Sequence, residues 1–300
     1  MYKVNYEFKS SGLSNMLNNN LRIFFVVAEH KSISAAAEAL YISTPAVSQA
    51  VKALENKLGT KLFIRNRHTG MILTPVGEQI FQFTGQMLSL EEQIFQAIHN
   101  EKGLLSGTVR IGAIPAVTGT ILAKPIAVFH QRYPGIHIDI QEGTPNDMVH
   151  KVECAMVDFA FSATPFGNLK FKTLIEDEMI AILPPDIAPV EKLALKGNLE
   201  GLILTKAAAE TLSEQTRNLI HLDLHRNYIV QDTETVVRFV TAGNGIGIVS
   251  RFALHAVPNR LSSCKIAPAV QIKIGIISRD FADLSPAAKE FVRMLEENFV

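Results

Sequence analysis

Cysteines and long apolar segments are scarce in this chain of 300 residues. Its two cysteines, Cys154 and Cys264, have neither the spacing of a metal site nor that of a disulfide framework. No apolar run is long enough to span a bilayer, and residues 1–20 lack the apolar segment of a secretory signal. These absences predict a soluble cytoplasmic protein with inert thiols, no metal site and no cofactor.

Charged residues are also sparse, at 19% of the chain against 47% hydrophobic residues. This balance excludes a disordered chain, and the length predicts about two or three domains. Formal net charge is zero, but residues 20–75 carry seven Lys or Arg and three acidic residues, whereas residues 76–300 carry 20 and 25. A basic head favours a polyanionic partner, although imbalances of this size are common on ordinary surfaces.

Residues 20–74 predict a small helical domain with a hairpin, after an extension over residues 1–19. We expect Asn20 to cap the first helix, Ser32 or Ser34 the second, and Ser43 or Thr44 the third. The inner stripe of the third helix is Val47, Val51, Leu54 and Leu58, and Gly59 ends it. The turn between the second and third helices has the length found in a helix-turn-helix.

The outer face of the third helix is free of acidic residues before Glu55. Its members are short, polar or basic: Thr44, Pro45, Ser48, Gln49 and Lys52. Such a face suits the major groove of DNA, where Ser, Thr and Gln can bond base edges. The alternative is an ordinary polar face on a small helical core.

Two further features support DNA as the partner. The capped N-terminus of the second helix, with Ser34, can face a phosphate. Strands over residues 61–65 and 71–73 predict a hairpin whose tip carries Arg65, Arg67 and His68, where a wing would touch the DNA backbone or minor groove.

Residues 75–106 predict a long helix followed by a hinge. Thr74 and Pro75 begin it, and its apolar residues follow steps of four and three: Val76, Ile80, Phe83, Met87, Leu90, Ile94 and Ala97. This heptad seam predicts dimerisation through Ile80, Phe83, Met87, Leu90 and Ile94, against the alternative of packing on its own domain. A break at residues 103–108 ends the helix.

Residues 107–300 alternate between strands and helices, which predicts a parallel α/β sheet covered by helices. We expect helices over residues 120–130, 145–156, 208–219, 233–242 and 285–298. Two similar halves predict two lobes with a cleft between them, residues 107–170 with 272–300 and residues 171–271.

Ligands of open α/β lobes bind where strands end. The residues at those ends are Pro115, Ala116, Val117, Thr144, Ser162, Thr205, Asp232 and Thr233. Helix N-termini near several of them would suit an anionic small molecule, although each residue is as readily a turn residue or a cap.

The whole pattern resembles the LysR-type transcriptional regulators. The matching segments are "LRIFFVVAEHKSISAAAEAL", "YISTPAVSQAVKALENKLGTKLF" and "MILTPVGE". This resemblance implies a winged helix-turn-helix, a linker helix and a regulatory domain like periplasmic binding proteins, in a homodimer or homotetramer. It also implies double-stranded DNA, a small-molecule effector and RNA polymerase as partners, and DNA contacts at Thr44, Pro45, Ser48 and Gln49. Many family members have Gln where Thr44 stands and Arg where Gln49 stands.

Two other functions fit parts of the sequence. One is a solute-binding module whose helical head contacts protein, which the acid-free helix face disfavours. The other is an α/β enzyme with a dimerisation cap. Because the sequence has no nucleophile, metal or phosphate-loop arrangement, we expect no enzyme.

Overall fold

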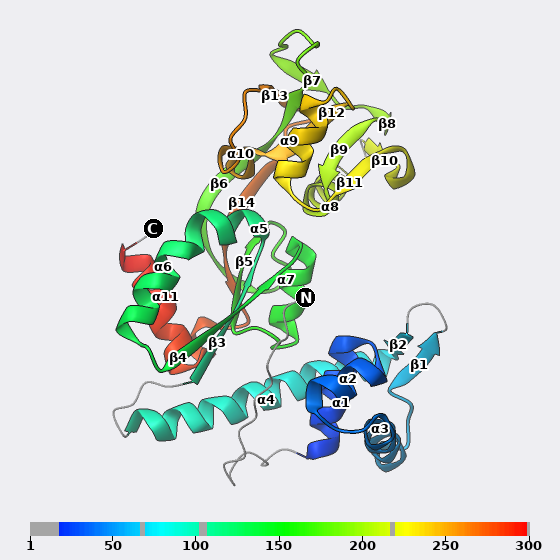
Figure 1. Cartoon of the computed structure of the whole chain (residues 1–300), viewed down its shortest axis with the longest axis vertical. Helices are drawn as coiled ribbons and strands as arrows, with labels where there is room; N and C mark the ends of the chain where they lie inside the picture. The colour runs from blue at the N-terminus through cyan, green and yellow to red at the C-terminus, as the bar shows by residue number, and fades with distance from the viewer. Residues whose placement is uncertain (1–17, 67–69, 102–106, 217–219, 299–300) are drawn as a thin grey trace. The chain divides into compact units, whose positions relative to one another are not determined.

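The computed structural model describes residues 18–66, 70–101, 107–216 and 220–298 (Figure 1). The chain divides into two compact units, residues 1–104 with 154–156 and the remaining residues from 105 to 300. The predicted fold class is confirmed, with a helical N-terminal head and a mixed α/β remainder.

The first unit is a winged helix-turn-helix followed by a long helix. Its elements are α1 (Asn19–His30), α2 (Ile33–Leu40), α3 (Thr44–Leu58), β1 (Phe63–Asn66), β2 (Gly70–Leu73) and α4 (Pro75–Glu101). The strands β1 and β2 pair in antiparallel register. The predicted hairpin tip at residues 67–69 and most of the predicted hinge lie outside the described residues, as does the side chain of Ala97 on the heptad seam.

Serine and asparagine side chains set where the first three helices begin. Ser32 accepts a hydrogen bond from Ala35 N–H, and Ser43 accepts one from Ala46 N–H. The expected cap at Asn20 is wrong, because α1 begins at Asn19 and the cap is Asn18, whose side chain accepts from Asn20 N–H. Three consecutive asparagines offer the same capping chemistry, so local sequence does not select among them.

The core of the head lies between α1, α3 and the hairpin. Phe24 and Val27 of α1 and Val47 of α3 are fully buried there. The predicted inner stripe of α3 is wrong at its last position, where Leu58 is 44% exposed. Glu55 is buried instead, since its carboxylate binds the start of the wing.

The second unit contains one long mixed sheet. Its strand order is β11-β9-β12-β6-β14-β5-β3-β4, and β13 and β7 pair off this path. The strands are β3 (Gly107–Ala113), β4 (Ile136–Glu142), β5 (Phe159–Ala163), β6 (Lys170–Leu183), β7 (Lys192–Ala194), β8 (Gly197–Leu199), β9 (Leu202–Thr205), β10 (Ile220–Leu222), β11 (Tyr228–Val230), β12 (Ile246–Ser250), β13 (Ser262–Ala267) and β14 (Gln271–Ser278). The helices are α5 (Pro115–Val117), the π-helix η1 (Thr118–Leu122), α6 (Ala123–Arg132), α7 (Pro145–Glu153), α8 (Lys206–Gln215), the 3-10 helices η2 (Leu224–Arg226) and η3 (Phe281–Asp283), α9 (Thr233–Thr241), α10 (Arg251–His255) and α11 (Pro286–Asn298).

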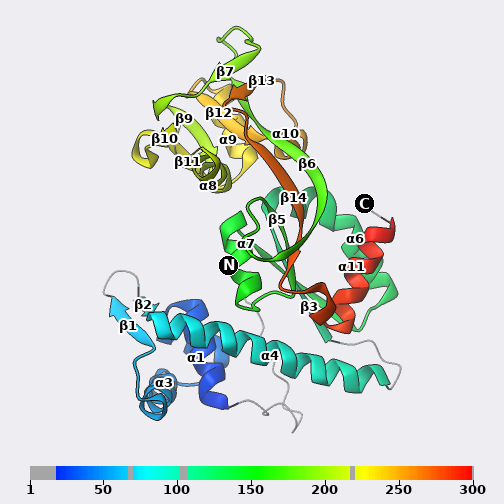
Figure 2. The same cartoon turned by 180° about the vertical axis from the view of Figure 1, so that it is seen from behind.

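Two long antiparallel strands, β6 and β14, run from one lobe into the other (Figure 2). The first lobe has one core, which includes Phe129, Phe159 and Phe291. In the second lobe, one core contains Leu204 and Leu212 and another contains Val236 and Val240. The two crossing strands are therefore the continuous covalent and hydrogen-bonded link between the lobes.

Several helix predictions differ from the structure in their bounds. The region predicted as a helix over residues 120–130 is a continuous run of α5, η1 and α6 from Pro115 to Arg132. The helix predicted to reach Met156 ends at Glu153. The predictions also omitted β6, β7, β8, β10, β13 and α10.

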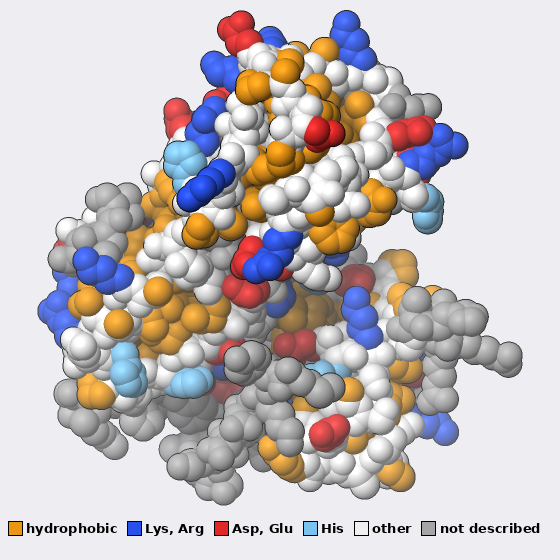
Figure 3. Space-filling model, turned by 45° about the horizontal axis from the view of Figure 1, so that its top comes forward, with side chains coloured by type: hydrophobic (Ala, Val, Ile, Leu, Met, Phe, Trp, Pro, Cys, Tyr) orange, Lys and Arg blue, Asp and Glu red, His pale blue; other side chains and the backbone are white. Residues whose placement is uncertain are grey.

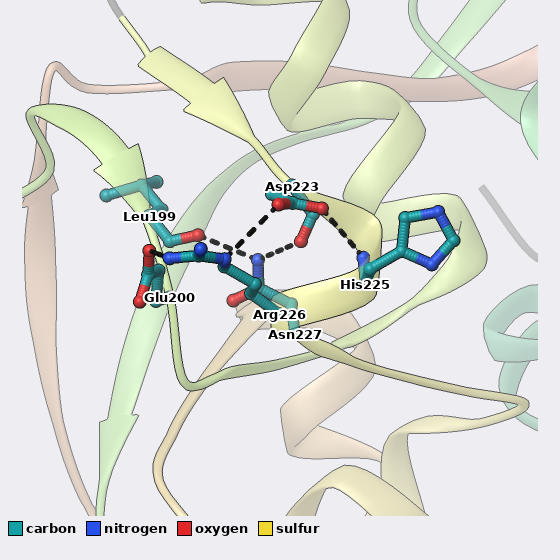
Figure 4. Close-up of polar contacts among 6 residues, drawn as sticks. All are labelled: Leu199, Glu200, Asp223, His225, Arg226 and Asn227. Carbon is teal, nitrogen blue, oxygen red and sulfur yellow. Dashed lines mark hydrogen bonds and ion pairs between the residues drawn. The ribbon is translucent and has the colours of Figure 1, made fainter.

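A buried asparagine fixes the edge of the second lobe (Figure 4). The Asn227 side-chain amide donates to the carbonyls of Leu199 and Asp223, and its oxygen accepts from Leu202 N–H at 2.8 Å. Nearby, Arg226 pairs with Glu200 and Asp223. These bonds hold the start of β11, whose far end leads to Asp232.

Candidate DNA-binding surface and ligand cavity

The outer face of α3 presents most of the residues predicted to contact DNA. Thr44, Pro45, Gln49 and Lys52 are exposed, and Ser48 is half-buried. Thr44 and Pro45 occupy the first turn, directly after the Ser43 cap. Because the next acidic residue, Glu55, is buried, the exposed strip from Thr44 to Lys52 carries positive charge alone.

Glu55 joins α3 to the wing. Its Oε1 accepts hydrogen bonds from the N–H groups of Leu62 and Phe63, and its Oε2 lies 2.5 Å from Lys61 Nζ. Burial acts to raise the pKa of Glu55, but the bonds from Lys61, Leu62 and Phe63 outweigh it and hold that pKa below its ordinary value. The ionised carboxylate therefore fixes the angle between helix and hairpin.

The hairpin is also tied to the end of α1. Met71 N–H donates to the carbonyl of Lys31 at 2.9 Å. Gly70 has φ +81° and its Cβ position would lie 2.4 Å from the same carbonyl oxygen, so only glycine fits there. Among the residues predicted for the wing, Arg65 lies on β1, whereas Arg67 and His68 fall outside the described residues.

A buried ion pair connects the head with the long helix. Arg22 of α1 lies 2.5 Å from Glu91 of α4, and their side chains are only 9% and 7% exposed. Ser34, the remaining predicted DNA contact, is exposed at the start of α2, where its hydroxyl lies 3.1 Å from that of Ser32.

The predicted heptad seam is an exposed apolar stripe on α4. Phe83 and Leu90 are 59% and 58% exposed, and Met87 and Ile94 are each 44% exposed. Ile80 differs, because it is half-buried and packs on the core of the head. Four of the five predicted dimerisation residues thus remain available to a partner.

A cavity of about 310 Å³ lies between the two lobes of the second unit. The first lobe contributes the start of α5, and the second lobe contributes the N-terminal ends of α8, α9 and α10. Met179 of β6 and Ile272 and Ile274 of β14 belong to the lining, so the crossing strands form part of it.

Five of the eight residues predicted for the effector site line this cavity: Pro115, Ala116, Thr205, Asp232 and Thr233. The others have structural roles. Val117 is fully buried in the first lobe's core, and the Ser162 hydroxyl is buried against the carbonyl of Pro145 at 3.4 Å. Thr144 and Asp147 cap the start of α7 reciprocally.

The predictions missed several polar lining residues, notably Gln231, Glu234 and Ser250. Gln231 directly precedes the predicted Asp232, so the strand-end rule could have included it. Ser250 caps α10 through Ala253 N–H at 3.0 Å, and a serine after an apolar strand is a recognisable helix start.

One hydrogen bond joins the lobes beside the cavity. The side-chain amide of Asn146, in α7, donates to Glu214 Oε1, in α8, at 3.3 Å. The Lys206 side chain does not line the cavity, and its Nζ lies 3.9 Å from Glu210 Oε1.

Two family models match the chain. The LysR substrate binding domain matches residues 102–300, and the bacterial regulatory helix-turn-helix protein model of the lysR family matches residues 18–78. The chain belongs to the LysR family of transcriptional regulators. It is 39% identical over 281 residues to "Uncharacterized HTH-type transcriptional regulator YoaU" of Bacillus subtilis (strain 168), covering 93% of this chain and 97% of that one.

Solved structures agree with the LysR fold. Full-length OxyR from Pseudomonas aeruginosa, solved as a cysteine-to-aspartate variant, superposes with a TM-score of 0.61 at 22% identity and covers 94% of each chain. CbnR, a LysR family transcriptional regulator, gives a TM-score of 0.55 at 16% identity, covering 94% of this chain and 99% of that one. At these identities the likeness concerns the fold alone.

In the part of the chain that the structure describes, no three His, Cys, Asp or Glu side chains are grouped so that they could hold a metal ion, and no helix is long and apolar enough to cross a membrane. Cys154 and Cys264 are both buried, and burial raises the pKa of Cys264.

Proposed function

We propose that this LysR-family regulator binds a partly palindromic promoter site by inserting α3 into the major groove. The observation that carries the proposal is the acid-free exposed strip of α3, in a helix-turn-helix that matches the family model. Thr44, Pro45, Ser48 and Gln49 would meet base edges, because they occupy the N-terminal end of the recognition helix.

Backbone contacts would surround this strip. Lys52, Arg65, Arg67 and His68 carry the charge or donors that phosphates and the minor groove attract, and Ser34 stands at a helix N-terminus. Such contacts position the head but do not read sequence, so they make the affinity salt-dependent.

Two chains would pair through the exposed seam of α4. The apolar stripe of Phe83, Met87, Leu90 and Ile94 is what a helix presents to a second helix, with Ile80 at its buried end. A homodimer places two heads on two half-sites about one helical turn apart, and a homotetramer would double this arrangement.

The second unit would act as the sensor, with its lobes divided near residues 107–170 with 272–300 and residues 171–271. A small molecule in the cavity contacts both lobes and the strands β6 and β14 that join them. Binding would favour one lobe arrangement over another and so change the spacing or bend of the bound DNA. We further propose that the protein works in the cytoplasm, contacts RNA polymerase and catalyses no reaction.

Footprinting of the DNA beside the gene tests this function. The expected result is protection of two half-sites about one turn apart, with a changed pattern when a binding small molecule is added. A purified protein that protects no region of that DNA would contradict the proposal.

A further inference from the structure

The cavity between the lobes carries an unbalanced set of charges. Among the described residues that line it, Asp232 and Glu234 are acidic, none is Lys, Arg or His, and most of the others are apolar. An anion that entered would lose hydration without gaining a cation, and it would approach two carboxylates.

Three cations on the helices that border the cavity are paired with carboxylates. The pairs are Lys206 with Glu210 at 3.9 Å, Arg238 with Glu234 at 2.5 Å and Arg251 with Glu178 at 2.6 Å. Lys206 also acts on Asp147 across the lobes: burial raises the pKa of Asp147, but bonds from Thr144 and the charge of Lys206 bring it below its ordinary value. Arg238 also interacts with the charge of Asp232, so the two acidic lining residues, Asp232 and Glu234, share one guanidinium and an excess of negative charge remains.

The three helix N-termini that the second lobe turns toward the cavity have side-chain caps, whereas the start of α5 in the first lobe has none. Thr205, Asp232 and Ser250 accept hydrogen bonds from Ala208, Thr235 and Ala253 N–H groups, respectively. At α9 the cap is itself a carboxylate, and Glu234 adds a second acid to the first turn. At α9 the attraction of the helix N-terminus for anions is thus already met by this chain's own acids.

Asp232 lies at the edge of a mainly apolar cavity. Its Oδ1 accepts from Thr235 N–H at 2.7 Å, and its Oδ2 takes no part in this cap. On the face drawn in Figure 3, the acidic and basic side chains of the described residues are scattered among hydrophobic and other neutral ones.

We infer that the effector is a mainly apolar molecule bearing a positively charged nitrogen, such as a protonated amine, placed beside Asp232. The inference rests on the proposed function, because it names the ligand class for the same cavity. It replaces the sequence-based preference for an anion, which considered the helix N-termini without their caps. The volume of about 310 Å³ suits a molecule of modest size.

Small molecules that share a skeleton but differ in charge test whether the cavity prefers a positively charged ligand. The full-length protein is heated with each member of three series, built on phenethyl, cyclohexylethyl and isopentyl skeletons, each as an amine, an alcohol and a carboxylate. At neutral pH and millimolar concentration, we expect amines to raise the melting temperature more than alcohols of the same skeleton, and carboxylates to leave it unchanged.

Asp232→Asn isolates the charge from the cap, because asparagine caps a helix as well as aspartate does. We expect this variant to keep its melting temperature without ligand and to bind the best amine about 5-fold to 10-fold more weakly by calorimetry. Affinity for the matching alcohol should not change. Asp223→Asn is the control, since Asp223 also caps a short helix through Oδ1 but does not line the cavity.

The inference is overturned if carboxylates stabilise the protein as much as amines do, if no amine stabilises it, or if Asp232→Asn leaves amine affinity unchanged. None of these measurements uses DNA. Failure to bind DNA would therefore overturn the proposed function while leaving the measured ligand preference in place. Failure to prefer amines would overturn this inference while leaving DNA binding in place.

Discussion

Glu55 links α3 to the wing with a single buried carboxylate. It accepts from two backbone N–H groups, at 3.0 Å and 3.4 Å, and pairs with Lys61. Sequence reasoning identified Glu55 only as the end of the acid-free face. The burial of Glu55 depends on Leu62 and Phe63, which follow the turn at Gly59 and bond to its carboxylate. The periodicity of α3 alone therefore did not reveal that Glu55 is buried.

Glu55→Ala should reduce the free energy of unfolding of the head by about 1–3 kcal/mol, because two buried N–H groups lose their acceptor. Since the folded pKa of Glu55 is lowered, its contribution is present above the unfolded-state pKa and is lost as pH falls through the folded-state value. Urea unfolding at neutral and acidic pH measures both effects. The difference between wild type and variant should shrink in acid, and Glu38→Ala, at an exposed site on α2, should have little effect at either pH.

Gln49 is the residue on α3 best placed to distinguish bases, since it is exposed one turn after the Ser43 cap. Gln49→Ala should cost about 1–3 kcal/mol at one base position and relax the preference there. Selection of bound sequences from randomised DNA measures the base preference at each position directly. Gln79→Ala, at an exposed glutamine on α4, should leave the selected sequence unchanged, and an unchanged sequence for Gln49→Ala would refute the assigned role.

At the scale of elements, the sequence predicted those helices and strands whose periodicity is undisturbed. The helices α1 to α4 and the hairpin strands β1 and β2 follow from cap residues and apolar alternation. β6 was missed because three consecutive acids, Glu176, Asp177 and Glu178, interrupt its apolar pattern. The structure explains two of them individually, since Asp177 binds Phe252 N–H and Glu178 pairs with Arg251.

The sequence also predicted part of the ligand cavity. Strand-end positions gave Pro115, Ala116, Thr205, Asp232 and Thr233, because parallel strands bring their ends to one edge. The sequence did not predict the apolar lining residues on β6 and β14, since their position depends on how the two lobes share these strands. The sequence also did not predict the net charge of the cavity lining, because that charge depends on whether the nearby cations are paired with carboxylates.

The exposed apolar seam of α4 is the surface through which we propose that two chains pair. Replacing Phe83 and Leu90 together by Asp should convert the oligomer to monomers, because each buried large apolar side chain contributes about 1.5–3 kcal/mol. Sedimentation equilibrium of the full chain measures the mass. Ile187→Asp, at an exposed isoleucine between β6 and β7, should keep the wild-type mass, and a double variant with wild-type mass would argue against the seam.

At the scale of the whole molecule, the chain combines a head that suits DNA with a two-lobed unit that encloses a cavity. The long helix α4 carries the seam that would pair two such chains. Each part has a separate test, so the loss of one activity can be assigned to one part of the molecule. DNA selection reports on α3, mass reports on α4, and the melting temperature with ligands reports on the cavity.

The central claim is sequence-specific DNA binding by α3, and a salt titration of DNA affinity tests it most directly. Fluorescence anisotropy would compare the protein's own upstream duplex with a random duplex of equal length, over a range of salt concentrations. We predict binding of the upstream DNA at least about 1,000-fold tighter at physiological salt, with both affinities falling as salt rises. Equal affinity for the two duplexes at every salt concentration would contradict the account.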